Sequence, residues 1–236
     1  MLYVHEVHHV IGRREDEFED LLRDTWLPAL AKSDGARLLW CCRHVHGTDP
    51  AYQLITLTAV RDGASWQQLA ARVQSGDLRE VAARLDECRH GLESKVLLPV
   101  PWSPLQDVDF GDVPDAGQDA ARAPVLFLED TGWPSAPLDA YTGFWGESYH
   151  APMQARPSAD RLLEVVAAFQ PAYGSGRRKE AILWQRILDH DKLLALLTQE
   201  TDPERKKPGT FMAEALGYRD EWESRLLRTV PWSPLR

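Results

Sequence analysis

Cysteine is scarce in this chain of 236 residues: there are three, and two of them, Cys41 and Cys42, are adjacent. Three cysteines cannot form a disulfide framework, and this usage predicts a reducing, cytoplasmic location. Long apolar runs are also absent, since none approaches the ~18 residues of a membrane span. The chain enters a strand-like pattern at Leu2, so we expect no signal peptide.

Positive charge is the minority sign, with 27 Lys and Arg against 36 Asp and Glu and a net charge of −9. A nucleic-acid surface needs clustered Lys and Arg, so this balance argues against one. The short cluster Arg205-Lys206-Lys207 lies among prolines and is typical of a solvated loop. Neither a Gly-x-Gly-x-x-Gly motif nor a Walker loop is present, so nicotinamide or flavin dependence has no support. By contrast, nine Trp and 44% apolar residues are sufficient for a substantial core.

The sequence contains an internal repeat. The pentapeptide Pro101–Leu105 returns as Pro231–Leu235, and the residues before each copy also match, with Arg89 opposite Arg219. An internal repeat of this length indicates duplicated structural units. We therefore predict two homologous halves, residues 1–105 and 124–236, joined by an acidic linker at 106–123.

The hydrophobic periodicity predicts the order β-α-β-β-α-β in each half, which is the ferredoxin-like arrangement. In the first half we expect strands at 2–10, 37–46, 52–60 and 92–100, with helices at 13–31 and at 66–88, the latter broken near Ser75-Gly76. In the second half we expect strands at 125–131, 161–169, 181–188 and 222–230, with a helix at 138–151 and a broken helical region at 192–218.

A unit of this order whose last strand reads Glu-Ser-Lys/Arg-x-Leu and ends in Pro-Trp-Ser-Pro-Leu resembles the NIPSNAP family of the dimeric α/β-barrel superfamily. The resemblance implies that two such sheets pack face to face in a closed barrel, here within one chain. The expected fold class is therefore α+β, with two tandem ferredoxin-like repeats forming an intrachain dimeric α/β barrel. Members of the superfamily include cofactor-free monooxygenases, isomerases, cyclases, dehydratases and haem proteins.

The strand period of two predicts which side chains face the helices and which line the barrel. We align Glu6 with Glu129, Phe18 with Tyr141, Arg37 with Arg161, Thr56 with Trp184, and Thr58 with Arg186. The predicted barrel-lining residues are Val4, Glu6, His8, Trp40, Cys42, His44, Leu54, Thr56 and Thr58, followed by Phe127, Glu129, Thr131, Glu164, Val166, Ile182, Trp184 and Arg186. This mixture of aromatic and ionisable side chains is typical of a small-molecule pocket.

Glu6 and Glu129 are the leading acid/base candidates, because a poorly paired buried carboxyl has a raised pKa. The alternative is that each pairs with a nearby arginine, Glu129 with Arg186 for example. His8 and His44 are further candidates for moving protons. His44 and His46 also have a spacing that could hold a metal, but a complete ligand set is missing. Adjacent strand residues point to opposite faces, so Cys41 and Cys42 are predicted to act as small apolar residues.

The predicted function is an enzyme without a tightly bound organic cofactor, acting on a hydrophobic, aromatic or polyketide-like molecule of the kind found in secondary metabolism. We assign catalytic roles to Glu6, His8, His44, Glu129 and Arg186, with Arg186 holding an oxyanion. The predicted substrate-binding residues are Val4, Trp40, Thr56, Thr58, Phe127, Trp184, Tyr149 and His150, the last two as a gate. Trp102 and Trp232 are expected to fix the two tails.

Two alternatives remain open: a carrier or haem-binding protein, with haem or a metal ion as its ligand, and a scaffold for interactions. A Soret band would identify haem. The expected partner is a small-molecule substrate, with no nucleic acid and no membrane, and two such chains could form a homodimer.

Overall fold

The structure is a computed structural model that describes residues 1–117, 123–173 and 178–236. Contacts divide the chain into two compact units. Unit 1 consists of Met1–Leu98, Gln106–Val125 and Leu226–Arg236, and unit 2 of Pro99–Leu105 and Leu126–Arg225. Residues 99–105, at the end of the first repeat, therefore belong to unit 2, and residues 226–236, at the end of the second repeat, belong to unit 1. The packing of the two sheets into one barrel stays a prediction.

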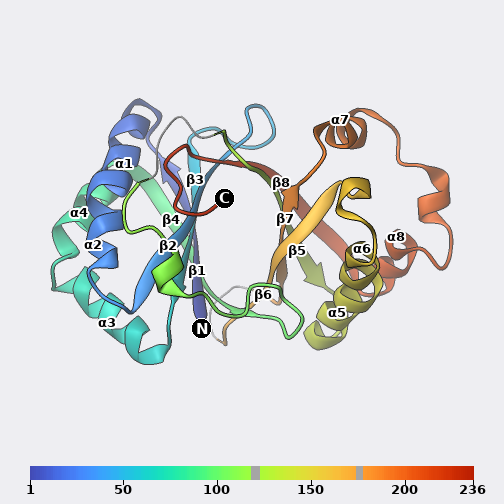
Figure 1. The fold of residues 1–236 in the computed structure, drawn as a ribbon, viewed down its shortest axis with the longest axis horizontal. Coiled ribbons are helices and arrows are strands. Elements are labelled where there is room, and N and C mark those ends of the chain that lie inside the picture. Colours follow the sequence, from blue (N-terminus) through green and yellow to red (C-terminus); the bar gives the residue numbers. More distant parts are fainter. Residues whose placement is uncertain (118–122, 174–177) are drawn as a thin grey trace. The chain divides into compact units, whose positions relative to one another are not determined.

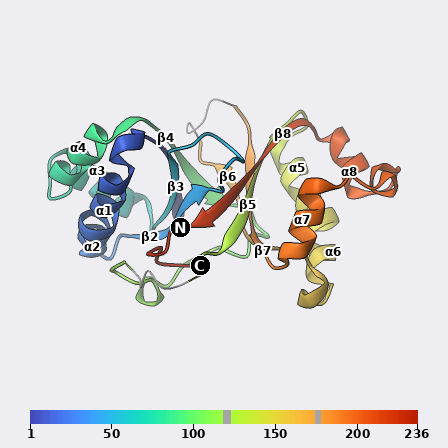
Figure 2. The same cartoon turned by 90° about the horizontal axis from the view of Figure 1, so that it is seen from above.

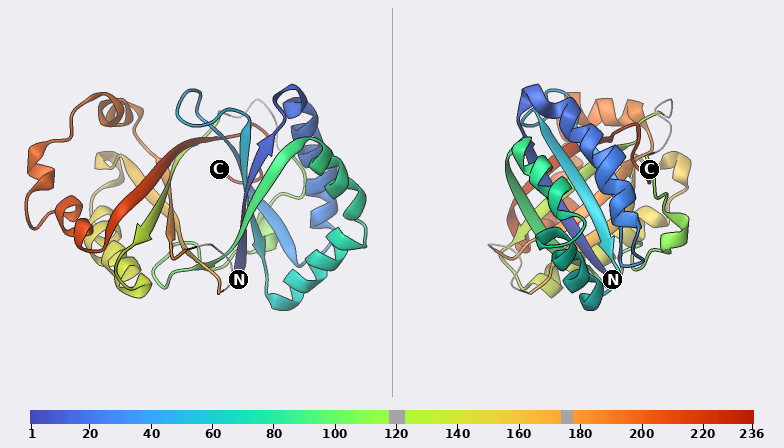
Figure 3. Two further views of the ribbon diagram at one scale, coloured as in Figure 1. Left: turned by 180° about the vertical axis from the view of Figure 1, so that it is seen from behind. Right: turned by 90° about the vertical axis from the view of Figure 1, so that its left-hand side faces the viewer.

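Unit 1 has the predicted β-α-β-β-α-β order, and its antiparallel strands are arranged β4-β1-β3-β2. Its strands are β1 (Leu2–Val10), β2 (Ala36–His44), β3 (Gln53–Val60) and β4 (Arg89–Pro99), and its helices are η1 (Gly12–Arg14), α1 (Glu15–Leu21), η2 (Leu22–Trp26), α2 (Leu27–Ala31), α3 (Gly63–Gln74), α4 (Arg79–Glu87) and η3 (Phe110–Asp112). Figures 1 and 3 show α1 to α4 on one face of this sheet.

Unit 2 repeats the arrangement, with the strand order β8-β5-β7-β6. Its strands are β5 (Leu126–Pro134), β6 (Leu163–Pro171), β7 (Ala181–Ile187) and the first part of β8 (Arg219–Thr229), and its helices are α5 (Leu138–Trp145), η4 (Gly146–His150), α6 (Ala151–Gln154), η5 (Ser158–Asp160), α7 (His190–Thr198), η6 (Pro203–Lys206), α8 (Phe211–Glu214) and η7 (Ala215–Gly217). Figure 2 shows α5 to α8 on one face of β5 and β7. The ferredoxin-like order predicted for each half is confirmed.

The first helical region of each half contains a π-helical turn. η2 and η4 are both π-helices of five residues, and a proline follows each at the start of the next helical segment. Such turns are rare and occur often at functional sites. The hydrophobic periodicity predicted the helical regions 13–31 and 138–151 but not these turns within them.

The two Pro-Trp-Ser-Pro-Leu segments, 101–105 and 231–235, are held in place by hydrogen bonds of their Trp and Ser residues. In unit 1, the Ser233 hydroxyl accepts a hydrogen bond from the Cys41 N–H (3.1 Å), and Trp232 Nε1 donates to Glu19 on α1 (3.3 Å). In unit 2, the Ser103 hydroxyl accepts from the Ala168 N–H (2.9 Å), and Trp102 Nε1 donates to the carbonyl of Thr142 on α5 (2.7 Å). The prediction that both tryptophans fix their tails is confirmed.

The predicted linker is partly packed. Phe110 and Val113 are buried in unit 1, and the guanidinium groups of Arg37 and Arg61 lie over the Phe110 ring at 5.3 and 4.9 Å. Residues 118–122 of this segment lie outside the described residues. Among the residues that the structure does describe, no helix is long and apolar enough to cross a membrane.

Candidate functional site

The strand pairings of the two halves correspond with a register that differs by one residue from the sequence alignment at strands one and three. Ser103 and Ser233 occupy the same position of the repeat and bind the N–H of Ala168 and Cys41, so these two strand residues are equivalent. Cys41 pairs with Thr56, which pairs with Glu6; Ala168 pairs with Leu183, which pairs with Asp130. Asp130 is therefore the counterpart of Glu6.

Strand four gives the same register independently. Ser94 and Ser224 are equivalent in the sequence repeat. Ser94 lies opposite Glu6 across the β1–β4 pair, and the Ser224 hydroxyl donates to Asp130. The alignment of Glu6 with Glu129 was thus wrong by one residue, and a slip of one residue moves a side chain to the other face of the sheet.

The orientation predicted for β1 and β3 is wrong for this reason. Val4 and Leu54 belong to the core cluster formed with the helices, and the His8 ring lies 5.2 Å from the Phe18 ring of α1. The side chains that face the helices, rather than away from them, are Val4, Glu6, His8, Leu54, Thr56 and Thr58. On β2 a bulge between Leu38 and Trp40 reverses the parity, so Trp40, Cys42 and His44 do face away from the helices.

In unit 1, three of the predicted site residues form one hydrogen-bonded cluster between sheet and helices. His8 Nε2 lies 3.0 Å from Thr56 Oγ1, and Thr56 Oγ1 donates to Glu6 Oε2 (3.4 Å). Arg89, at the start of β4, places its Nη1 atom 2.8 Å from His8 Nδ1 and donates through Nε to Asp86 (2.9 Å).

The donor and acceptor in each of these hydrogen bonds follow from the chemistry of Arg89. A guanidinium group only donates, so His8 Nδ1 must accept and the ring proton sits on Nε2. His8 then donates to Thr56, and Thr56 donates to Glu6. Burial, together with the charge of Arg89, lowers the pKa of His8 to about 3, which keeps the ring neutral. Burial also raises the pKa of Glu6, against the opposing effects of Arg89 and Thr56.

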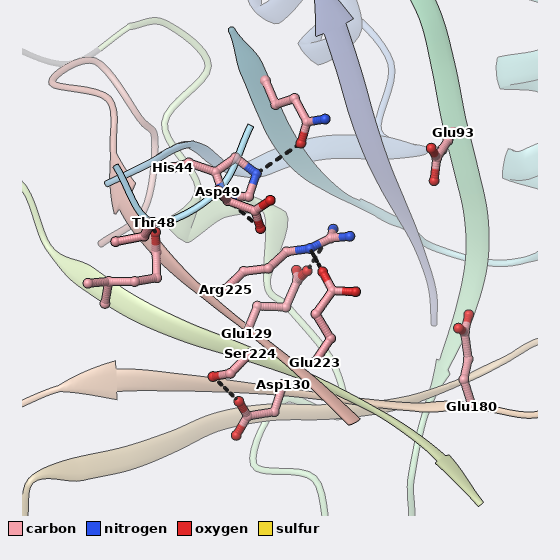
Figure 4. Close-up of polar contacts among 12 residues, drawn as sticks. His44, Thr48, Asp49, Glu93, Glu129, Asp130, Glu180, Glu223, Ser224 and Arg225 are labelled. Carbon is pink, nitrogen blue, oxygen red and sulfur yellow. Dashed lines mark hydrogen bonds and ion pairs between the residues drawn. The ribbon is translucent and has the colours of Figure 1, made fainter. Parts of the chain in front are cut away.

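Unit 2 carries an equivalent cluster around Asp130, and Figure 4 shows its contact with Ser224. Ser224 donates to Asp130 Oδ1 (2.5 Å) and Gln185 Nε2 donates to Oδ2 (2.7 Å), while the Tyr149 hydroxyl on η4 donates to Gln185 Oε1 (2.5 Å). Burial raises the pKa of Asp130 to about 6, although Ser224, Arg219 and Gln185 all favour the ionised form. The carboxyl group therefore exchanges its proton near neutral pH.

Both carboxyl groups lie beside an exposed serine of strand four. The Glu6 side chain keeps 23% of its surface exposed, and Ser94 opposite it is exposed. In unit 2, Ser224 is exposed and the neighbouring Trp222 is 52% exposed, with the Arg219 guanidinium 4.9 Å from its ring centre. Each carboxyl group thus lies next to an exposed side chain of strand four.

The other predicted residues of unit 2 lie where expected but have different partners. Phe127, Glu129, Trp184 and Arg186 share the face turned away from the helices, and the Phe127 and Trp184 rings are 5.6 Å apart. Glu129 is 1% exposed and lies 3.5 Å from Arg225, whereas Arg186 pairs with Glu164. The suggested pairing of Glu129 with Arg186 is therefore wrong, and a catalytic role for either residue stays a prediction.

His44 and Tyr149 make polar contacts, while His150 stacks on an aromatic ring. In unit 1, His44 Nε2 is 3.1 Å from Gln53 Oε1 and His44 Nδ1 is 3.5 Å from Asp49. In unit 2, Tyr149 joins the Asp130 cluster, and His150 stacks on Trp102 at 5.0 Å. Within the described ranges, no three His, Cys, Asp or Glu side chains are grouped so that they could hold a metal.

Four residues of these two clusters were not proposed from the sequence: Arg89, Asp130, Gln185 and Ser224. Two of them belong to pairs that the repeat had already revealed, Arg89 with Arg219 and Ser94 with Ser224. Polar residues that recur in a duplicated strand are a signal that could have located the site. Asp130 was hidden because it follows another acid, Glu129.

The fold and the site together define a tandem ferredoxin-like α/β protein with a partly buried carboxyl group at the same position of each unit. An anthrone oxidase-like protein has this fold, with a TM-score of 0.58 and 10% identity over 97% of this chain and 91% of that chain. A candidate monooxygenase from Lactobacillus acidophilus gives a TM-score of 0.55 at 10% identity, over 96% and 93% of the two chains.

A NIPSNAP family protein from Agrobacterium tumefaciens aligns at 18% identity over 45% of this chain and 100% of that chain, with a TM-score of 0.35. The similarity to NIPSNAP proteins therefore stays a resemblance. No family model matches the chain, and no curated protein matches its sequence.

Proposed function

We propose that this protein is an enzyme that acts by acid–base chemistry on a hydrophobic, aromatic small molecule, with Asp130 and Glu6 as the proton-accepting groups. One observation carries the proposal: a carboxyl group of raised pKa recurs at the same position of both units, each at the end of a chain of hydrogen bonds. The proposal includes no tightly bound organic cofactor.

The chemistry follows from where each carboxyl group is held. A general base works best when its pKa lies near the operating pH. Asp130, with a pKa of about 6, is mostly ionised at pH 7 and still basic enough to take a proton from an acidic C–H or O–H group. Ser224 and Gln185 each bind one of its oxygens and so orient the lone pairs that remain for the substrate.

In unit 1 the equivalent group has a different support. Thr56 and His8 hold Glu6, and Arg89 fixes the tautomer of His8, so these residues position the carboxyl group and take no proton themselves. We therefore retain Glu6 as a catalytic residue and assign His8 and Thr56 as positioning residues.

The neighbours in fold support an aromatic substrate. One is described as anthrone oxidase-like and another as a candidate monooxygenase. Anthrone itself is a suitable probe, because it is flat and apolar and has an acidic C–H bond next to its rings. Tyr149 of the Asp130 cluster packs in a core that contains further aromatic side chains, including Trp145, Phe144 and Tyr218.

The test is proton exchange, which requires no oxidation. Anthrone in D₂O under anaerobic conditions should lose its acidic C–H signal in the proton NMR spectrum faster with the protein than without it. Asp130→Asn should slow the catalysed exchange by a factor of roughly 100 or more, the usual contribution of a general base. Glu6→Gln should slow it further when combined with Asp130→Asn.

Asp139→Asn is the matched control, because Asp139 is an exposed acid in the first turn of α5 and lies outside both clusters. This variant should exchange at the rate of the unmodified protein. Full exchange activity in the Asp130→Asn, Glu6→Gln double variant would contradict the proposal.

A further inference from the structure

We infer that the unit 2 cluster is a recognition site for the hydroxyl group of a flat aromatic ligand, a phenol in the simplest case, held by Asp130, Tyr141 and Arg219. The inference rests on the proposed function and names the ligand class of that site. It comes from two buried donor groups that have no partner, and from a glycine that leaves room for one of them.

Tyr141 is the first unsatisfied donor. The residue is fully buried on α5, and the proton of its hydroxyl has no acceptor among the described residues. The Trp145 ring packs against it with centroids 4.5 Å apart, but an indole N–H only donates, so the Tyr141 proton still lacks an acceptor. Leaving a buried hydroxyl unsatisfied is unfavourable, because the group gives up its hydrogen bonds to water and gains none.

Arg219 supplies the second donor. Its Nε atom is buried and has no partner within the described residues, while its guanidinium lies over the Trp222 ring. Arg219 acts electrostatically on both Asp130 and Tyr141, and Asp130 acts on Tyr141, so the three groups are neighbours in unit 2. Two unsatisfied donors beside one carboxylate are therefore collected in the same part of unit 2.

Gly132 shows that this arrangement is specific to unit 2. A Cβ atom at Gly132 would lie 2.0 Å from the Tyr141 hydroxyl oxygen, so any larger residue would displace it. The counterpart of Gly132 in unit 1 is His8, whose two ring nitrogens are both engaged. In unit 1 this position thus holds the imidazole of His8, which has its hydrogen-bond partners. In unit 2 the same space holds the Tyr141 hydroxyl, which lacks an acceptor.

The number of donors and acceptors identifies the ligand group. A hydroxyl has one donor and two lone pairs. The site offers one acceptor, the remaining lone pairs of Asp130, and two donors, the Tyr141 O–H and the Arg219 Nε–H. A ligand carboxylate would place a second negative charge beside Asp130, and a ligand ether could not donate to it. Trp222, at the exposed side of the site, provides an aromatic surface for the rings attached to the hydroxyl.

Calorimetric titration with 2-naphthol and its methyl ether tests the inference. The naphthol should bind at least tenfold more tightly than 2-methoxynaphthalene, because a site built for a hydroxyl rejects an analogue that leaves its polar groups unpaired. Tyr141→Phe should remove most of this preference. Tyr3→Phe is the matched control: Tyr3 is also fully buried, but its hydroxyl donates to the Gln106 carbonyl (3.3 Å) in unit 1, so the preference should remain.

Thermal unfolding of the ligand-free variants separates recognition from structure. Tyr141→Phe should be as stable as the unmodified protein or more stable, because it removes an unsatisfied group, whereas Tyr3→Phe should be less stable. Equal affinities for naphthol and ether, binding of neither, or a Tyr141→Phe variant that keeps the preference would each overturn the inference.

The proposed function fails separately. If Asp130→Asn leaves anthrone exchange intact while naphthol is still preferred over its ether, the site recognises a hydroxyl without performing the acid–base step. If exchange is lost in Asp130→Asn while naphthol and ether bind equally, the acid–base step stands and the hydroxyl recognition does not.

Discussion

Asp130 and Glu129 are neighbours on β5 with opposite surroundings. Glu129 faces away from the helices and lies beside Arg225, whereas Asp130 faces them and is held by Ser224 and Gln185. Because both residues are acidic, either one can be aligned with Glu6, and the sequence offers no means of choosing. The existence of a duplicated carboxyl group was therefore predictable, but its position was not.

The raised pKa of Asp130 predicts a pH dependence of stability. The folded state binds this proton more tightly than the unfolded state, whose ordinary value is 3.8, so the stabilisation is complete below that pH and is lost as the pH rises through about 6. Between pH 4 and pH 7, the free energy of unfolding of the unmodified protein should therefore fall by up to about 3 kcal/mol more than that of Asp130→Asn, as measured by denaturant unfolding. Parallel pH profiles of the two proteins would contradict the raised pKa.

At the scale of elements, the periodicity predicted all eight strands, and the structure confirms them. What it could not predict were local insertions. The bulge on β2 between Leu38 and Trp40, and its counterpart on β6 between Val165 and Ala167, each reverse the facing of the residues that follow. A bulge adds one residue to one strand, and on a strand as fully buried as β2 it leaves no mark on the apolar pattern. The face assignment failed on β1 and β3 because the two halves were aligned with a slip of one residue, and it was right for the second part of β2.

The serines of the Trp motifs stabilise the strands just beyond these bulges. Ser233→Ala would leave the buried Cys41 N–H without an acceptor, and Ser103→Ala would do the same to the Ala168 N–H. Each substitution should lower the free energy of unfolding by about 1–2 kcal/mol, measured by urea denaturation. Ser148→Ala, at an exposed position of η4, is the control and should change it little. Equal stability of all three variants would show that these hydroxyl groups are dispensable.

At the scale of the whole molecule, the repeat in the sequence is not the unit of stability. Each unit includes the C-terminal segment of the other half, so neither half contains all the residues of a compact unit. The duplication was visible in the sequence, but the exchange was not. The pentapeptide comes directly after its own strand in the sequence whether it packs in its own unit or in the other one.

Removal of residues 231–236 tests this exchange. Unit 1 would lose Trp232, which is 3% exposed, and Ser233, which is fully buried. Loss of a buried Trp usually costs about 3–5 kcal/mol, so the truncated chain should unfold at a clearly lower temperature, and cysteines of unit 1 should become reactive with a thiol reagent. A chain that lacks only Arg236 is the control. An unchanged melting temperature after removal of all six residues would contradict the assignment of this segment to the unit 1 core.

The most direct measurement compares two adjacent acids that face opposite sides of one strand. Anaerobic anthrone exchange should be measured side by side for Asp130→Asn and Glu129→Gln, each folded and at equal concentration. We predict that exchange falls about 100-fold in Asp130→Asn and stays within a few-fold of the unmodified rate in Glu129→Gln. The reverse result would place the chemistry on the face turned away from the helices and would contradict the central claim.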